Sequence, residues 1–169
     1  MLTLAIVLLA ATFTSCEKSN DAATSSDVPS AGWRLGTTNY STAFAMRNAG
    51  QPNSIGFFSA LPNTNGFSGV AVIFNNTTGI AAGTYKVVVK TSQSLLLADE
   101  IMVSTGTNYS QSTGRYEKDY VTALTETVNA TVTISGGKAR IVVPTINMVS
   151  LPITTSSVTA PFAGTLIEP

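Results

Sequence analysis

From Trp33 to Leu166, apolar residues recur at every second position, and turn-forming residues interrupt the pattern about every 8–12 positions. A period of two places alternate side chains on opposite faces of an extended strand, whereas a helix requires a period near 3.6. The pattern therefore predicts an all-β fold. We expect a single antiparallel β-sandwich of about 8–10 strands.

One β-hairpin, Val128–Val143, is determined by two independent features of the sequence. Gly136 and Gly137 form the kind of two-residue loop that supplies a positive φ at both turn positions. The register that this loop sets also places six apolar residues on one face. The expected pairs are Ile134 with Ala139, Val132 with Ile141 and Ala130 with Val143.

The remaining strands are expected where apolar and polar residues alternate. These segments are Trp33–Thr37, Tyr40–Met46, Ile55–Leu61, Phe67–Phe74, Ala82–Lys90 and Val158–Leu166. In Leu95–Val103 a helical turn competes with a strand. Asn108–Thr127 is the least patterned segment, so we expect a long excursion there.

The patterned segment, residues 32–169, suits one domain, since about 140 residues bury roughly two thirds of their unfolded surface in a single core. Lys plus Arg and Asp plus Glu both number nine, so the chain is neutral overall. Neutrality argues against nucleic acid as a partner, since nucleic acid favours clustered Lys and Arg. Charged residues make up only 11% of the chain, which leaves solubility to Ser, Thr and Asn and is typical of an extracellular β protein.

Cysteine and histidine usage narrows the possible chemistry. The chain has one cysteine, Cys16, and no histidine. These counts exclude an intramolecular disulfide, a Ser-His-Asp triad and a His-ligated metal site, and we expect no cofactor and no metal.

Carboxylates remain as the route to hydrolysis, and a glycosidase needs two of them about 5–9.5 Å apart. Asp99 and Glu100 are adjacent and would point to opposite faces of a strand. Glu117 and Asp119 could share a face but lie beside basic residues. We therefore interpret both pairs as solvated charges and do not expect an enzyme.

Met1–Cys16 has the form of a lipoprotein signal, in which about a dozen nearly unbroken apolar residues end at small residues and a cysteine. The run is too short to cross a bilayer as a helix, which needs about 20 residues. Phe13-Thr14-Ser15-Cys16 resembles the bacterial lipobox, in which signal peptidase cuts before a cysteine that becomes lipidated. The alternative is an ordinary secretory signal cut near Ala10-Ala11.

Lipidation of Cys16 would divide the chain into a signal peptide (1–15), an acylated cysteine with a flexible tether (16–31) and a β-sandwich domain (32–169). The tether is expected because residues 17–31 are small and polar and have no apolar period. A multiply acylated cysteine holds a protein stably on a membrane. We therefore expect a lipid-anchored protein of the outer membrane or cell surface.

Several strand segments carry a wider resemblance. AGTYKVVV at 82–89, TVTISGGKARIVV at 131–143 and FAGTLIE at 162–168, with a strand pair near Trp33 and Tyr40, look similar to a family of small Bacteroidota envelope lipoproteins. The resemblance implies an envelope location and a β-sandwich fold. It implies no catalytic residues.

These features predict a non-enzymatic lipoprotein that binds a glycan, a peptide or a partner protein. The alternative is a structural accessory subunit of an envelope complex or appendage that pairs through a sheet edge. We expect any ligand contact in Tyr109–Glu126, above all at Tyr116 and Tyr120, because tyrosine combines a flat apolar face with a polar tip. The other interpretation of this segment is a solvated loop whose tyrosines lie back on the sandwich.

Overall fold

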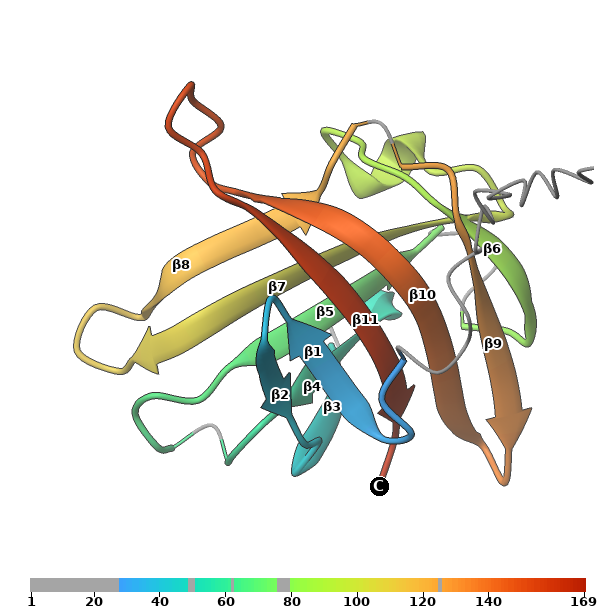
Figure 1. Ribbon diagram of the computed structural model, residues 1–169. Coiled ribbons are helices and arrows are strands. Elements are labelled where there is room, and N and C mark those ends of the chain that lie inside the picture. The colour runs from blue at the N-terminus through green and yellow to red at the C-terminus, as the bar shows by residue number, and fades with distance from the viewer. Residues whose placement is uncertain (1–27, 49–50, 62, 76–79, 125) are drawn as a thin grey trace, which may run out of the picture.

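The computed structural model describes residues 28–48, 51–61, 63–75, 80–124 and 126–169, and its fold is all-β, as the sequence predicts (Figure 1). These residues form eleven strands and a short 3₁₀ helix, η2 (Gln93–Leu95). The strands are β1 (Gly32–Leu35), β2 (Thr38–Tyr40), β3 (Phe44–Asn48), β4 (Gln51–Phe58), β5 (Gly69–Phe74), β6 (Gly83–Val87), β7 (Glu100–Ser110), β8 (Arg115–Thr122), β9 (Asn129–Ser135), β10 (Lys138–Ser150) and β11 (Thr159–Ile167).

All eleven strands belong to one hydrogen-bonded sheet, so the predicted two-sheet sandwich is not confirmed. The strand order is β2-β1-β11-β10-β9-β6-β7-β5-β4-β3, and β8 pairs with both β7 and β10. Among the described strands the pairing is antiparallel except between β6 and β7, which run parallel.

The two longest strands explain why one sheet replaces two. β7 pairs along one edge first with β6 and then with β8, and β10 pairs first with β9 and then with β8. The ladder therefore continues from one side of the molecule to the other, and β10 and β11 cross in front of β5 and β7 in Figure 1. Alternating apolar residues occur in both arrangements, so the sequence pattern could not distinguish them.

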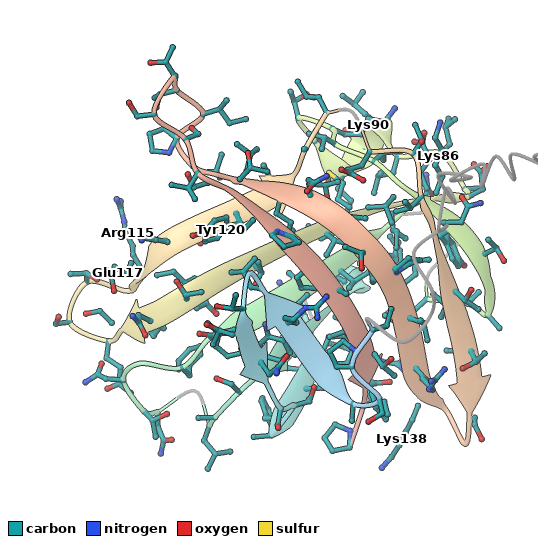
Figure 2. The ribbon with its side chains drawn as sticks, viewed as in Figure 1. Lys86, Lys90, Arg115, Glu117, Tyr120 and Lys138 are labelled. Atoms are coloured by element: carbon teal, nitrogen blue, oxygen red, sulfur yellow. The ribbon has the colours of Figure 1, made fainter. Side chains whose placement is uncertain are left out.

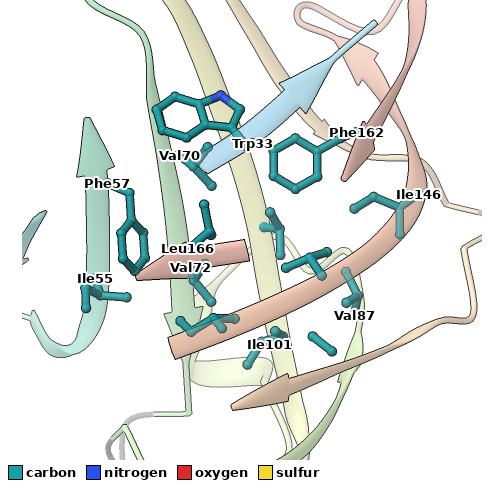
Figure 3. Close-up of a cluster of buried hydrophobic side chains, with 14 of the residues drawn as sticks. Trp33, Ile55, Phe57, Val70, Val72, Val87, Ile101, Ile146, Phe162 and Leu166 are labelled. Carbon is teal, nitrogen blue, oxygen red and sulfur yellow. The ribbon is translucent and has the colours of Figure 1, made fainter. Parts of the chain in front are cut away.

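One apolar core fills the inner face of this curled sheet (Figure 3). Trp33 of β1 and Phe162 of β11 belong to the same cluster as Phe57 of β4 and Val70 of β5, and none of the four is more than 1% exposed. Burial of each such side chain contributes about 1.5–3 kcal/mol. The two ends of the strand order thus pack against each other, which leaves the outer face of β4, β5, β7 and β8 free to build a surface site.

The glycine hairpin between β9 and β10 is confirmed. Ile134 pairs with Ala139 and Val132 pairs with Ile141, as the loop requires. The φ angles of the two loop glycines, Gly136 and Gly137, are 58° and 76°. Most of the expected inward positions are buried, whereas Ile134 beside the turn is 38% exposed because the tip extends past the core.

The expected excursion at Asn108–Thr127 is wrong, because this segment forms most of a second hairpin, β7–β8. Its two strands stay paired out to Ser110 and Arg115. The outer half extends beyond the apolar core, so its strands lack the alternation that marks a half-buried strand. Packing between the rings of Tyr109 and Tyr116, whose centroids are 5.2 Å apart, stabilises this half instead.

The predicted strand Tyr40–Met46 divides into β2 and β3, which lie at opposite ends of the strand order. Leu95–Val103 divides into the end of η2 and the first part of β7. In the described part of the chain, no helix is long and apolar enough to cross a membrane. The signal peptide 1–15, Cys16 and residues 17–27 of the tether lie outside the described residues.

Candidate functional site

Five aromatic rings form a cluster outside the main core. This aromatic cluster consists of Phe44 (β3), Phe58 (β4), Phe67 (just before β5), Tyr109 (β7) and Tyr116 (β8). The ring of Phe67 lies at the centre, 4.6 Å from Tyr109 and 5.8 Å from both Phe58 and Tyr116 between centroids. Phe67 is buried, whereas the other four rings are only partly buried. They therefore remain accessible at the surface.

Two glycines let the ring of Tyr116 lie against the sheet itself. Gly69 of β5 pairs with Gly106 of β7, and Gly106 pairs with Asp119 of β8. A Cβ atom on Gly106 would overlap the Tyr116 ring, and a Cβ atom on Gly69 would lie 2.5 Å from its hydroxyl oxygen. Only glycine leaves room for such a close approach inside a strand. These positions therefore fix where the tyrosine ring lies.

A groove of about 260 Å³ opens beside Tyr116 on the outer face of the sheet. Small residues form its floor: Gly56, Gly69, Ala71, Ser104 and Gly106. Larger side chains border it: Phe58, Tyr116, Asp119, Tyr120, Val121 and Leu151. We call this site the outer groove. Its lining is mainly apolar, with a few polar groups, as is common for small-molecule sites.

Four polar side chains of the outer groove make no hydrogen bond or ion pair with a described residue. They are the hydroxyl groups of Ser104, Tyr116 and Tyr120 and the carboxylate of Asp119, of which Tyr120 is largely buried in the core. The main chain of Asp119 is well held, since its carbonyl accepts a hydrogen bond from the N–H of Leu151 at 2.8 Å. The strand is thus fixed while the side-chain oxygens stay available to a ligand.

Partial burial raises the pKa of two ionisable side chains in the outer groove, Tyr116 and Asp119. Burial is the main cause that raises the pKa of Tyr116 to about 12, and the charges of Asp119 and Tyr109 add to it. Burial also raises the pKa of Asp119 above its usual value. Tyr116 is therefore a neutral hydrogen-bond donor near pH 7. Asp119 is still exposed and has no hydrogen-bond donor among the described residues, so a ligand hydroxyl could donate to its carboxylate.

The structure separates the two tyrosines that the sequence predicts as ligand contacts. Tyr116 belongs to the aromatic cluster and lies along the outer groove. Tyr120 is 7% exposed and belongs to the apolar core, although part of it also borders the groove. Figure 2 shows Tyr120 at the middle of β8, with Arg115 and Glu117 toward the outer end of the strand. The direct contribution of Tyr116 and Tyr120 to binding stays a prediction.

Sequence reasoning missed most of the aromatic cluster around Tyr116. Phe44, Phe58 and Phe67 come from segments that the alternation assigns to ordinary strands, and nothing in their spacing indicates that their rings meet. The available signal was glycine inside strand patterns, at Gly69 and Gly106, because interior glycine marks a close approach to the backbone.

The interpretation of Glu100 as a solvated charge is wrong, because the structure buries this carboxylate. Glu100 is 6% exposed, accepts a hydrogen bond from the N–H of Leu97 at 3.0 Å and pairs with Lys90 at 3.4 Å. The Leu97 N–H is the main cause that lowers the pKa of Glu100, and desolvation opposes it. Glu117 accepts a hydrogen bond from the side chain of Asn108 at 2.9 Å. Within the described residues, no group of three or more Cys, Asp or Glu side chains could hold a metal ion.

No family model, curated protein or solved structure matches this chain. The chemistry of the outer groove is therefore inferred from its own residues.

Proposed function

We propose that this chain is a non-enzymatic, lipid-anchored binding protein of the outer membrane or cell surface, and that its ligand occupies the outer groove. The proposed ligand is a glycan, a peptide or a segment of a partner protein. The aromatic cluster carries this proposal, because four of its five rings remain partly exposed and two of them, Phe58 and Tyr116, line a concave site. Rings in this position supply large contact areas at a low cost in conformational entropy, and they are enriched at binding surfaces.

The residues of the outer groove support recognition better than catalysis. Asp119 is the one carboxylate among the residues that line it, whereas glycoside hydrolysis normally uses a pair. Tyr116, with a pKa of about 12, stays protonated at neutral pH and is a poor general base there. The groove therefore provides flat apolar contacts and hydrogen bonds without a matched acid and base.

The alternative, an accessory subunit that pairs through a sheet edge, has less support from the strands at the ends of the sheet. β2 has three residues and β3 has five. The side chain of Arg47 in β3 is already bound to Glu168. Strand addition draws its affinity from a run of main-chain hydrogen bonds, and edges this short offer few of them.

Lipid anchoring at Cys16 is part of the proposal and has its own test. Cells that express the protein or the Cys16→Ser variant are labelled with a fatty acid analogue and fractionated. We expect label and membrane association in the wild type and neither in the variant. Equal membrane association, with no loss of label, would exclude Cys16 as the anchor.

Binding at the outer groove can be tested with a variant that fills it. Ser104→Phe places a ring on the groove floor at a strand position where aromatic residues are tolerated. Thr131→Phe is the matched control, since it adds the same ring at an exposed position of β9, away from the groove. Full-length protein is screened in detergent against glycan and peptide arrays. We expect binding that Ser104→Phe abolishes and Thr131→Phe preserves, and equal binding by both variants would exclude the groove.

A further inference from the structure

We infer that the outer groove takes one ring of a neutral carbohydrate, with the apolar face of the sugar against the Tyr116 ring and Ala71, and sugar hydroxyls on Asp119, Ser104 and the Tyr116 hydroxyl. This inference rests on the proposed function and names the class of ligand. It follows from the shape of the groove, from its polar groups and from the absence of an open strand edge along the groove.

The shape of the outer groove matches a flat ring. The open part of its floor is made by the short side chains of Ala71 and Ser104, because Tyr116 covers Gly106 and the Tyr116 hydroxyl and the Phe58 ring cover Gly69. The rings of Tyr116 and Phe58 border this floor. A pyranose has one face rich in C–H groups that packs on such surfaces. The volume of about 260 Å³ has room for one sugar ring and its hydroxyls.

The polar groups match a ligand that carries several hydroxyls. The carboxylate of Asp119 can only accept hydrogen bonds when it is ionised, and the hydroxyls of Tyr116 and Ser104 can both donate and accept. No described residue uses these side-chain oxygens. A sugar hydroxyl can donate to Asp119 and accept from Tyr116, so each protein group would gain a partner. An alkyl chain would cover the same groups and leave them unpaired.

The strands of the floor argue against an extended peptide. Peptides that bind to sheets usually add a strand, which requires an open edge with unpaired N–H and C=O groups. β5 lies between β4 and β7, and β7 lies between β5 and β8 along the groove, so these strands are paired on both sides. Only side chains and the flat face of the sheet remain for recognition. The negative charge of Asp119 likewise disfavours an anionic sugar or a phosphate.

The test measures binding of neutral oligosaccharides to the full-length protein in detergent by calorimetry and glycan array. Probes are gluco-, xylo-, manno- and galacto-oligosaccharides, with a peptide library and choline as comparison ligands. The variants are Ser104→Phe, Asp119→Asn and Tyr116→Phe, with Thr131→Phe as the control. Circular dichroism and melting curves establish that each variant is folded before its binding is compared.

We expect at least one neutral oligosaccharide to bind, Ser104→Phe to abolish binding, and Asp119→Asn and Tyr116→Phe each to weaken it about tenfold. Thr131→Phe should bind as the wild type does. Peptide or choline binding that Ser104→Phe abolishes, with no sugar binding, overturns the carbohydrate assignment and leaves the groove as the binding site. Sugar binding that Ser104→Phe does not change overturns the location. No binding by any probe overturns the carbohydrate assignment and, in the proposed function, a glycan or peptide ligand.

Discussion

Arg47 and Glu168 are separated by 121 positions in the chain and form a two-point ion pair. Nε of Arg47 donates to Oε1 of Glu168 at 2.9 Å, and Nη2 donates to Oε2 at 2.8 Å. Nη2 also donates to the carbonyl of Gly137, and Oε2 accepts a hydrogen bond from the N–H of Ala139. The pair therefore links edge strand β3 to the β9–β10 hairpin and to the end of β11. None of these three strands is a neighbour of β3 in the sheet.

The first prediction concerns the pH dependence of this pair. The hydrogen bond from Arg47 is the main cause that lowers the pKa of Glu168. A lowered pKa means that the stabilisation is complete above the pKa of Glu in the unfolded chain, about 4.3, and is lost as the pH falls through the lower value of the folded state. Glu168→Gln should reduce the free energy of unfolding by about 0.5–1 kcal/mol at pH 7, a modest figure because Arg47 is 43% exposed.

Urea unfolding of the wild type and Glu168→Gln at pH 7 and pH 3 measures this effect. The difference between the two proteins should shrink at pH 3, which lies below the pKa of Glu in the unfolded chain, about 4.3. Asp99→Asn is the control, since Asp99 is exposed and its side chain makes no ion pair in the described part of the chain. A difference that does not change with pH would show that the ion pair contributes nothing through its charge.

The second prediction concerns the contact between Gly106 and Tyr116. Gly106→Ala adds a methyl group where the ring now lies, so the ring must move or the strand must shift. We expect a loss of about 1–3 kcal/mol in stability, as for other overpacked sites. In a Tyr116→Ala background the same change should cost much less, because the obstructing ring is gone.

Thermal or urea unfolding of the two single variants and the double variant gives the coupling between these positions. Gly83→Ala is the matched control, because a Cβ atom there meets its nearest neighbour at 3.4 Å, an ordinary contact. Additive effects of Gly106→Ala and Tyr116→Ala would show that the ring does not lie on Gly106 in solution.

The third prediction separates the two tyrosines of β8. Tyr120 is 7% exposed within the core, so Tyr120→Ala should lower stability by about 3 kcal/mol or more. Tyr116 packs in the surface cluster against Phe67 and Tyr109, and Tyr116→Ala should cost about 1–2 kcal/mol. Unfolding by urea, followed by circular dichroism, ranks the two. Equal losses would place both rings in the core and remove Tyr116 from the candidate site.

The sequence predicts much of the local structure and little of its arrangement in space. The β9–β10 hairpin is confirmed because its loop glycines and its apolar face independently specify one register. The β7–β8 hairpin is missed because its outer half packs tyrosine rings at the surface and buries no alternating face. The single sheet is missed because pairing of β8 with both β7 and β10 depends on strand lengths and twist, which alternation does not encode.

The sequence predicts one residue of the candidate site but not the residues that surround it, because these come together only through the pairing of several strands. The chemistry of tyrosine, a flat apolar face with a polar tip, predicts Tyr116 as a contact, and the structure places it beside the outer groove. Phe58 and Asp119 join it only through the register of β4, β5, β7 and β8, in which Phe58 pairs with Gly69. A register that spans four strands cannot be read from any one segment. Glycines inside strands were the local clue to this contact.

The fourth prediction uses the pKa of Tyr116 to report on the outer groove. A tyrosine whose folded-state pKa is raised to about 12 contributes stability that is complete below the unfolded value near 10 and is lost as the pH rises toward 12. Ultraviolet titration of tyrosinate should therefore show one tyrosine ionising near pH 12 that is absent from Tyr116→Phe. Asp119→Asn should lower this pKa only in part, because burial is the larger cause. The contradicting result is a wild-type curve that differs from that of Tyr116→Phe by one tyrosine ionising near pH 10 and does not differ above pH 11. That result would show that the Tyr116 ring is solvated and that the groove is open to water on that side.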